Sequence, residues 1–311
     1  MNQLSGPGVF VNARSITIVT LLSVAYMVLS YYLIGFKSDE VVLVALCNGL
    51  FYTSRITRKF ILGFSIFALY WIIFDYMKAF PNYNYAPVHI AQLYNFEKSL
   101  FGIHYNGKII TANEYWLIHH KTWMDIVGGI FYLCWIPVPM GFAVYLFFTR
   151  KKEFLYFALT FFLVNLLGFV VYYTYPAAPP WYVQLHGFNF IAKTPGNIAG
   201  LGRFDHLVNA DVFKGIYTKG SNVFAAMPSL HSAYPIIVVY YGLKNRLGWV
   251  NVLLISVMLG IWFTAVYASH HYIVDVLSGI VCAITGILLF NFIAKLKPVE
   301  LFLNKYASII S

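Results

Sequence analysis

The sequence predicts an all-α, polytopic membrane protein. Of its 311 residues, 60% are hydrophobic and only 10% are charged, which leaves too little polar surface to coat a soluble globule. The apolar residues gather in runs, most of them long enough to cross a bilayer as a helix. Polar and aromatic connections separate these runs. The composition therefore excludes a soluble globular protein.

Eight apolar runs are expected to form membrane-spanning helices. The first follows a polar stretch that ends at Arg14, and it is longer than the apolar region of a secretory signal peptide, so we expect it to be retained. The second and sixth runs are short for a bilayer. No linker or internal repeat divides the chain, and we expect one membrane-embedded domain over residues 1–311. The runs lie at 16–36, 40–54, 60–76, 126–148, 154–175, 228–243, 249–268 and 271–294.

Two connections, 77–125 and 176–227, are much longer than the others, which is typical of loops that cover a site. Tracing eight spans places both on one face of the membrane. Twelve of the 21 Lys and Arg residues lie near the short connections of the opposite face. By the positive-inside rule that opposite face is cytoplasmic. The long connections are therefore expected on the extracytoplasmic face, of a bacterial inner membrane or of a Golgi-type membrane.

Segment 87–102, in the first long connection, has apolar residues at Ile90, Leu93, Tyr94 and Phe101 among charged ones. This spacing predicts an amphipathic helix that lies on the membrane surface. Such a helix would be a lid, a lipid entry ramp or a plain connector.

Charge and cysteine spacing exclude other functions. The net charge of +10 comes from residues scattered at the ends of apolar runs, so it indicates membrane topology and lipid head groups and not nucleic acid. The three cysteines each sit in an apolar run, without the spacing of a disulfide framework or a zinc site. We expect a structural or interfacial role for four histidines, which are His119, His120, His186 and His206.

Two short motifs place polar residues at the mouths of expected spans. They are Met227–Pro235, with the sequence MPSLHSAYP, and His270–Asp275, with the sequence HHYIVD. Both motifs fall on the face of the long connections. Since an ionisable residue beside hydrocarbon is costly, such a cluster is by default a functional hypothesis.

The chemistry that these motifs favour is phosphoryl transfer. Asp275 lies one helical turn after His271, where its carboxylate would orient one ring nitrogen and leave the other as a nucleophile. His231 lies in the first turn of a helix expected to begin at Pro228, whose N–H groups and dipole favour a phosphate, and Ser229 would donate to it as well. His271 would attack phosphorus to form a phosphohistidine while His231 protonates the leaving alkoxide. No metal or other cofactor is required, because preorganised charges can stabilise the transition state.

An alternative interpretation of these residues is a zinc site, in which His231, His270, His271 and Asp275 would supply the nitrogen and oxygen ligands. The chain has no His-Glu-x-x-His motif, and the adjacent His270 and His271 would point to different faces of a helix. Both observations count against a zinc site.

The two motifs together resemble those of a known superfamily. The Pro-Ser-x-His motif that ends at His231, followed by the His-x-x-x-Asp motif of His271 and Asp275, is similar to the type 2 phosphatidic acid phosphatase superfamily. The resemblance implies a six-helix membrane core, here about residues 60–294 with about two further N-terminal spans, and a phosphohistidine mechanism. It makes His271 the nucleophile, Asp275 its partner and His231 the acid and base, with Ser229 at the phosphate.

Two cations of the superfamily's phosphatases are missing. No Lys-x6-Arg-Pro motif occurs, and Thr264 and Ala265 stand at the Ser-Arg positions before the nucleophile. Arg203 is the first choice as a replacement because of its bidentate fork. The further candidates precede His231 as well and are Lys193, Lys214 and Lys219.

The form of the motifs resembles one branch of the superfamily more specifically. His-His-Tyr-x-Val-Asp, together with the Tyr-Pro-Ala-Ala-Pro-Pro-Trp-Tyr segment that ends at Tyr182, is similar to inositol phosphorylceramide synthases, which are transferases. Trp181 and Tyr182 are expected either to contact a lipid head group or to form an aromatic belt at the membrane interface. His270 is expected near the phosphate.

We therefore expect a phosphotransferase that moves phosphoinositol from phosphatidylinositol to ceramide and releases diacylglycerol. One alternative is a lipid phosphate or undecaprenyl-type pyrophosphate phosphatase, with water as the acceptor. Another is a non-enzymatic lipid transporter whose histidines relay protons. The missing phosphatase cations favour transfer over hydrolysis, and the expected phosphate site favours chemistry over transport. The sequence does not predict the oligomeric state.

Overall fold

The computed structural model describes residues 13–217 and 222–311, which are almost wholly helical or in connecting loops. A short antiparallel hairpin joins β1 (Ile103–Tyr105) to β2 (Lys108–Ile110). All eight expected spans are helical, which confirms the all-α polytopic class. Among the described residues, six helical segments are long and apolar enough to cross a membrane, and they are Ala13–Ile34, Arg55–Ala79, Thr122–Thr149, Lys151–Thr174, Val250–Tyr267 and Ile273–Ile293.

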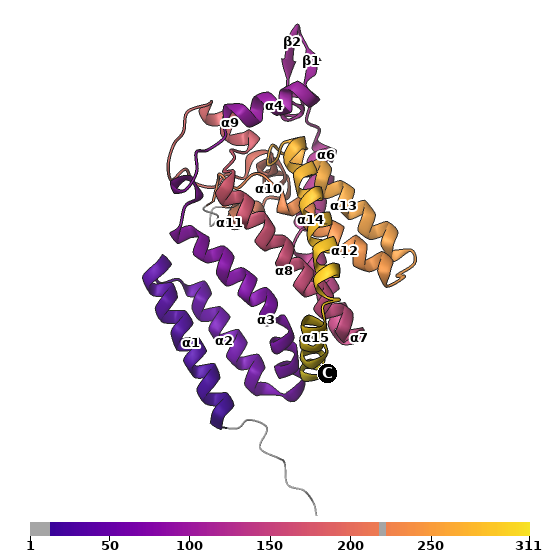
Figure 1. The fold of residues 1–311 in the computed structure, drawn as a ribbon. Coiled ribbons are helices and arrows are strands. Elements are labelled where there is room, and N and C mark those ends of the chain that lie inside the picture. Colours follow the sequence, from indigo (N-terminus) through magenta and orange to yellow (C-terminus); the bar gives the residue numbers. More distant parts are fainter. Residues whose placement is uncertain (1–12, 218–221) are drawn as a thin grey trace, which may run out of the picture.

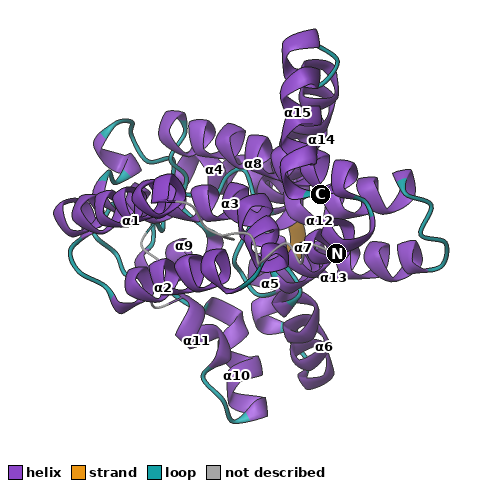
Figure 2. Ribbon diagram, turned by 90° about the horizontal axis from the view of Figure 1, so that it is seen from below, coloured by secondary structure: helices purple, strands orange, loops and turns teal. Residues whose placement is uncertain are grey.

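The N-terminal helices form a layer at the edge of the bundle. They are α1 (Ala13–Ile34), α2 (Ser38–Thr53) and α3 (Arg55–Tyr76), and α3 packs on α8 (Lys151–Thr174). Seen from below, α1 and α2 lie at one edge of the molecule, with α3 between them and α8 (Figure 2). The other helices are α4 (Ala91–Phe101), α5 (Ala112–Ile118), α6 (Thr122–Leu133), α7 (Pro137–Thr149), α9 (Pro180–His186), α10 (Gly202–Val208), α11 (Val212–Tyr217), α12 (Leu230–Lys244), α13 (Val250–Tyr267), α14 (Ile273–Ile293) and α15 (Lys297–Ile310).

The centre of the bundle is α12, which packs against α8, α13 and α14. Its apolar contacts with α8 are fully buried, as at Phe157 and Val164 on α8 and Ala233 and Ile237 on α12. The buried side chains pack in one large cluster, which explains why a helix of only 15 residues is held at this position. The short sixth run of the sequence is thus an interior helix.

The expected span 126–148 consists of two helices, α6 and α7. The break lies between Leu133 and Pro137, and Pro137 begins α7. Proline has no N–H to donate to the preceding turn and disfavours helical geometry in the residue before it. The break leaves a turn directly beside α12, where Trp135 contacts the ring of His231.

The long and short connections lie at opposite ends of the bundle. Figure 1 shows α4, the β1–β2 hairpin and α9 at one end and α15 at the other. At the α15 end, Lys244 pairs with Glu153 at 3.0 Å, and Arg150 donates to the side chain of Asn245 at 2.8 Å. The sequence did not predict α15, an amphipathic helix whose Tyr306 hydroxyl donates to a carbonyl of α3.

The two long connections are hydrogen-bonded to each other through their backbones. Ala177 forms parallel bridges with His89 on one side and with Ala225 on the other. The expected amphipathic helix of segment 87–102 is observed as α4, which follows His89 directly. Both connections therefore form one layer over the end of the bundle, next to the start of α12.

Candidate active site

The turn between α13 and α14 carries His270 and His271. Its Ser269 lies in the left-handed region, with φ at 59°. The N–H of Ser269 donates to the carbonyl of Val266, and the N–H groups of both histidines donate to the carbonyl of Ala265. These bonds form a Schellman motif, in which glycine is the usual left-handed residue. A serine in this position gave no sequence signal for the turn.

The turn sends the two histidine rings in different directions. Nε2 of His271 lies 3.1 Å from Nδ1 of His231, within hydrogen-bond distance. Nε2 of His270 instead bonds to the carbonyl of Ile198 at 3.0 Å. The ring of Tyr132 stacks on both His231 and His270, with centroids 5.4 and 5.6 Å apart. The structure thus brings His231 and His271 together and turns His270 away from them.

Asp275 is fully buried behind His271. Its Oδ2 lies 3.6 Å from Nδ1 of His271, slightly beyond hydrogen-bond distance. The same oxygen accepts the N–H of Tyr272 at 2.9 Å. The two side chains are therefore neighbours without a direct hydrogen bond, and α14 begins at Ile273, two residues later than the sequence predicts.

The helix that carries His231 begins at Leu230, two residues after the expected Pro228. Ser229 is its N-cap, and the Ser229 hydroxyl accepts hydrogen bonds from the N–H and the hydroxyl of Ser232. Ser229 is also fully buried. Its hydroxyl therefore stabilises the start of α12, and its expected contact with a phosphate stays a prediction.

Neighbouring helices hold the start of α12 in place. The hydroxyl of Tyr172 on α8 donates to the carbonyl of Pro228 at 3.0 Å. Nε1 of Trp262 on α13 donates to the carbonyl of Ser232 at 3.0 Å. A backbone carbonyl of α14 accepts the N–H of Ser229 at 3.0 Å. The position of His231 is thus fixed by contacts from three helices.

Both histidines of the turn are neutral at neutral pH. Burial lowers the pKa of His271 to about 4, and it lowers the pKa of His270 to about 3. The physical cause is the cost of removing an imidazolium from water. A neutral ring has one nitrogen with a free lone pair, which is the form that a nucleophile needs.

Two side chains of the first long connection hold the His271 turn. The carboxylate of Glu97 accepts the N–H of Ile273 at 3.1 Å and the N–H of Val274 at 3.0 Å. Nδ2 of Asn113 donates to the carbonyl of His271 at 2.9 Å. Both side chains are completely buried. Neither residue was predicted from the sequence.

A sequence signal for Glu97 did exist. It lies four residues after Leu93 and four before Phe101, so a carboxylate interrupts the apolar face of α4. Burial raises the pKa of Glu97, the charge of Asp275 adds to this effect, and the two backbone N–H donors oppose it. A charged residue within an apolar stripe therefore indicated a buried polar contact.

Trp181 and Tyr182 are buried beneath the loop layer. The N–H of Trp181 donates to the carbonyl of Ser269 at 3.1 Å, and the hydroxyl of Tyr182 donates to the carbonyl of Asn189 at 2.7 Å. The aromatic-belt interpretation is therefore wrong for these two residues, because a belt is exposed at the interface. Their contact with a head group stays a prediction.

Arg203 is engaged by a carboxylate. Its Nε donates to the buried side chain of Asp125 at 2.7 Å, and the hydroxyl of Tyr267 donates to the same oxygen at 2.8 Å. Its Nη2 is buried and has no hydrogen-bond partner within residues 13–217 and 222–311. Of the other candidate cations, Lys193 is exposed, Lys214 pairs with Asp211, and Lys219 lies outside the described residues. A phosphate contact of Arg203 stays a prediction.

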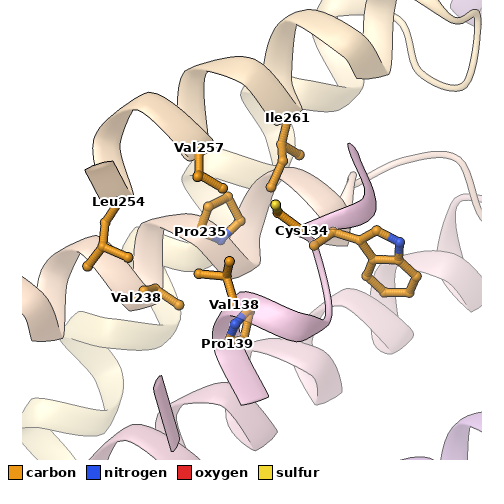
Figure 3. A pocket seen from close by; sticks show the side chains of 9 residues that line it. Cys134, Val138, Pro139, Pro235, Val238, Leu254, Val257 and Ile261 are labelled. Atoms are coloured by element: carbon orange, nitrogen blue, oxygen red, sulfur yellow. The ribbon is translucent and has the colours of Figure 1, made fainter. Parts of the chain in front are cut away.

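A narrow apolar pocket lies between α7, α12 and α13 (Figure 3). The ring of Trp135 lines the pocket and meets the His231 ring edge-on, with centroids 4.4 Å apart. The space is too small to hold a water molecule, so it is a packing gap between helices and not a lipid site. The other lining residues are Cys134, Val138, Pro139, Pro235, Val238, Leu254, Val257 and Ile261.

The zinc alternative finds no support in the geometry. Within the part of the chain that the structure describes, no group of three or more His, Cys, Asp or Glu side chains is placed to hold a metal ion. His270, one of the four expected ligands, points to a backbone carbonyl instead.

Comparisons with known proteins cover both the site and the loop layer. A family model described as the PAP2 superfamily matches residues 91–289. Phosphoinositol dihydroceramide synthase from Bacteroides thetaiotaomicron is 44% identical over 296 residues, which are 94% of this chain and 97% of that protein. No solved structure matches the chain.

Fungal proteins match over shorter regions. Inositol phosphorylceramide synthase from Candida albicans is 33% identical over 171 residues, 51% of this chain and 35% of that protein. The catalytic subunit of inositol phosphorylceramide synthase from Saccharomyces cerevisiae is 31% identical over 117 residues, 37% of this chain and 29% of that protein.

Proposed function

The chain belongs to the PAP2 superfamily, and we propose that it transfers phosphoinositol from phosphatidylinositol to the primary hydroxyl of ceramide or dihydroceramide, releasing diacylglycerol. The observation that carries this proposal is the contact between His231 and His271 at 3.1 Å in a buried site at the end of the bundle. The identity of 44% with a phosphoinositol dihydroceramide synthase, over 97% of that protein, supports the choice of lipids.

The first step forms a phosphohistidine. Nε2 of His271 attacks phosphorus, the new P–N bond forms, and the P–O bond to the diacylglycerol oxygen breaks. His231, which carries a proton once the anionic donor phosphate is bound beside it, gives that proton to the leaving oxygen, so that diacylglycerol leaves as a neutral alcohol. The phosphorylated ring of His271 is then positive, and the carboxylate of Asp275 at 3.6 Å stabilises the charge next to Nδ1.

The second step reverses these roles. The primary hydroxyl of the ceramide attacks phosphorus and gives its proton to His231. The P–N bond breaks, and His271 returns to its neutral form. His231 ends the cycle protonated, ready to serve as the acid for the next donor lipid, so protons balance over the two steps.

The resting site must open before the donor can bind. A phosphorus atom and its leaving oxygen do not fit between two nitrogens that are 3.1 Å apart. The phosphate would therefore take the place of the direct contact, with His271 on one side and His231 on the other. Until then, Nε2 of the nucleophile lies within hydrogen-bond distance of Nδ1 of His231.

The cover of the site favours transfer over hydrolysis. Groups from both long connections bond to the turn that carries His271, namely Glu97, Asn113 and the N–H of Trp181. His271 is only 5% exposed. A covered phosphohistidine is protected from water, whereas an acceptor that enters along the bilayer still reaches it.

We further place the site on the extracytoplasmic side of the membrane, with the short, basic connections in the cytoplasm. The bundle ends differ accordingly, because Arg150, Lys151 and Lys152 lie at the start of α8, and Lys244 lies at the end of α12 opposite to His231. We also propose that residues 1–311 form a single membrane-embedded domain.

The test is a lipid assay with the purified protein in detergent. Fluorescent ceramide and phosphatidylinositol are incubated with chelator and without added metal, and wild type is compared with His271→Ala. The expected result is a new polar sphingolipid together with diacylglycerol, absent in the variant. Release of inositol phosphate without ceramide conversion would identify a hydrolase, and the absence of any lipid turnover would favour a transporter.

A further inference from the structure

We propose that Glu97 is a positioning residue for the nucleophile, a buried carboxylate on the surface helix α4 that fixes the first turn of α14 and, through it, the ring of His271. This inference rests on the proposed function for its activity readout, but its structural readout is independent of any activity. Nothing in the family motifs includes this residue.

The geometry of Glu97 is that of a helix cap supplied from a distant segment. Its Oε1 accepts the N–H of Ile273 at 3.1 Å, and its Oε2 accepts the N–H of Val274 at 3.0 Å. Both groups belong to the first turn of α14, where N–H groups have no partner within the helix. Glu97 is fully buried, so water cannot replace either bond.

The cap also directs the substrate. The N-terminus of a helix attracts anions through its free N–H groups and its dipole. Because Glu97 occupies two of these N–H groups and Asp275 accepts that of Tyr272, the start of α14 is closed to a phosphate. A lipid phosphate is thereby left to the rings of His231 and His271.

The backbone around His271 is held at every position. Its N–H donates to Ala265, its carbonyl accepts from Asn113, and the next three N–H groups are bonded to Asp275 or Glu97. Of these partners, Glu97 supplies two bonds from outside the turn. Its loss leaves two buried N–H groups without an acceptor in the segment directly after the nucleophile.

Helix α4 ties this cap to the membrane interface. Its inner face buries Leu93 and Glu97, while Phe96 and Leu100 on the outer face are 53% and 56% exposed. Exposed apolar side chains on a surface helix insert into the interfacial region of a bilayer. The contact of Glu97 with α14 thus links a lipid-facing helix to the catalytic turn.

The test compares the full-length wild type with Glu97→Gln and with Glu300→Gln, a matched change of an exposed glutamate on α15. The amide keeps the size of the side chain but turns an NH2 group toward one backbone N–H. Hydrogen–deuterium exchange is measured for peptides that contain residues 272–276, and kcat and KM are measured for fluorescent ceramide.

We expect Glu97→Gln to speed exchange of these amides by about tenfold or more and to lower kcat by about 10- to 100-fold, with KM changed less than about threefold. Glu300→Gln should match wild type. Wild-type exchange and kcat in Glu97→Gln would overturn the proposal, and so would a loss of kcat without faster exchange.

Two further results separate the possible failures. If wild type transfers no head group, the proposed function is wrong, while the exchange of residues 272–276 still decides the role of Glu97. If Glu97→Gln does not fold, Glu97→Asp takes its place, since it keeps the charge but not the reach. Faster exchange and a lower kcat are expected in it too, and wild-type values would overturn the proposal.

Discussion

The close approach of α14 to the start of α12 makes Gly279→Ala a sharp test of the site geometry. A Cβ at Gly279 would lie 2.1 Å from the carbonyl oxygen of Ser229, with no flexible side chain to yield. Ser229 caps α12, and His231 follows two residues later in the same turn. The added methyl group therefore pushes on the segment that carries His231.

The size of the effect follows from the distance. Real Cβ atoms essentially never approach other atoms closer than 3.0 Å, so the two helices must separate by about 0.9 Å at this point. Overpacking of this kind costs about 1 to 3 kcal/mol of folding stability. A shift of about 1 Å between reacting groups can cost about 100-fold in rate. His231 would move by a displacement of this order relative to His271, which lies in the turn before α14.

The assay measures thermal unfolding and kcat for ceramide conversion in the same preparations. Gly141→Ala is the control, because a Cβ at Gly141 in α7 meets nothing within 4 Å. Since alanine is the better helix former, Gly141→Ala should be neutral or more stable than wild type by up to about 1 kcal/mol. Gly279→Ala should unfold at a lower temperature and lose about 100-fold in kcat. Equal unfolding temperature and equal kcat in Gly279→Ala and wild type would refute the reasoning.

Three further predictions follow from charge and topology. Because burial lowers the pKa of His271 to about 4, kcat/KM on the acid side should fall only as the pH approaches that value, and a fall near pH 6.5 would contradict this. The same shift should lower the free energy of unfolding as the pH falls from about 6.5 toward 4, because the ring binds a proton in the unfolded chain but not in the folded one. Arg203→Ala should lower the free energy of unfolding by about 2 to 3 kcal/mol in chemical denaturation, because the buried Asp125 loses its cationic partner and keeps only the hydrogen bond from Tyr267. Adding Asp125→Asn should restore stability but not activity if Arg203 binds the phosphate. A cysteine at Lys108 should react with an impermeant maleimide in sealed spheroplasts and one at Lys295 only after lysis, and the reverse pattern would invert the proposed topology.

The sequence predicted the membrane helices well because their signal is local. A helix that crosses hydrocarbon requires a long apolar run and hydrogen bonds within the helix, and both depend only on residues close together in the sequence. The run 228–243 was expected despite its short length, and α12 lies at the centre of the bundle. The break between α6 and α7 was not predicted, although Pro137 and Pro139 marked it. The run 126–148 is apolar throughout, and this predicted one continuous helix although the two prolines indicated a break.

The contact of His231 with His271 was also predictable, because each lies in a short motif at the mouth of a span. The orientation of His270 needed the structure, since it depends on the left-handed Ser269 and on a carbonyl 72 residues earlier in the chain. Ser229 shows that a motif does not by itself define the role of each of its residues. Its hydroxyl was expected at the phosphate, but the same hydroxyl is the N-cap of α12, a use that serine has in any protein.

Glu97 and Asn113 mark the boundary of what sequence reasoning can find in this chain. Each bonds to a segment more than 150 residues away, and no local pattern specifies such a partner. What the sequence does contain is an inconsistency, a carboxylate on the apolar face of α4. A buried charge must find hydrogen-bond donors, and in a membrane protein the free donors are concentrated at the starts of helices. An acidic residue within the apolar stripe of a loop helix therefore indicates that this helix caps a membrane span, and here the capped span is the one that begins directly after the nucleophile.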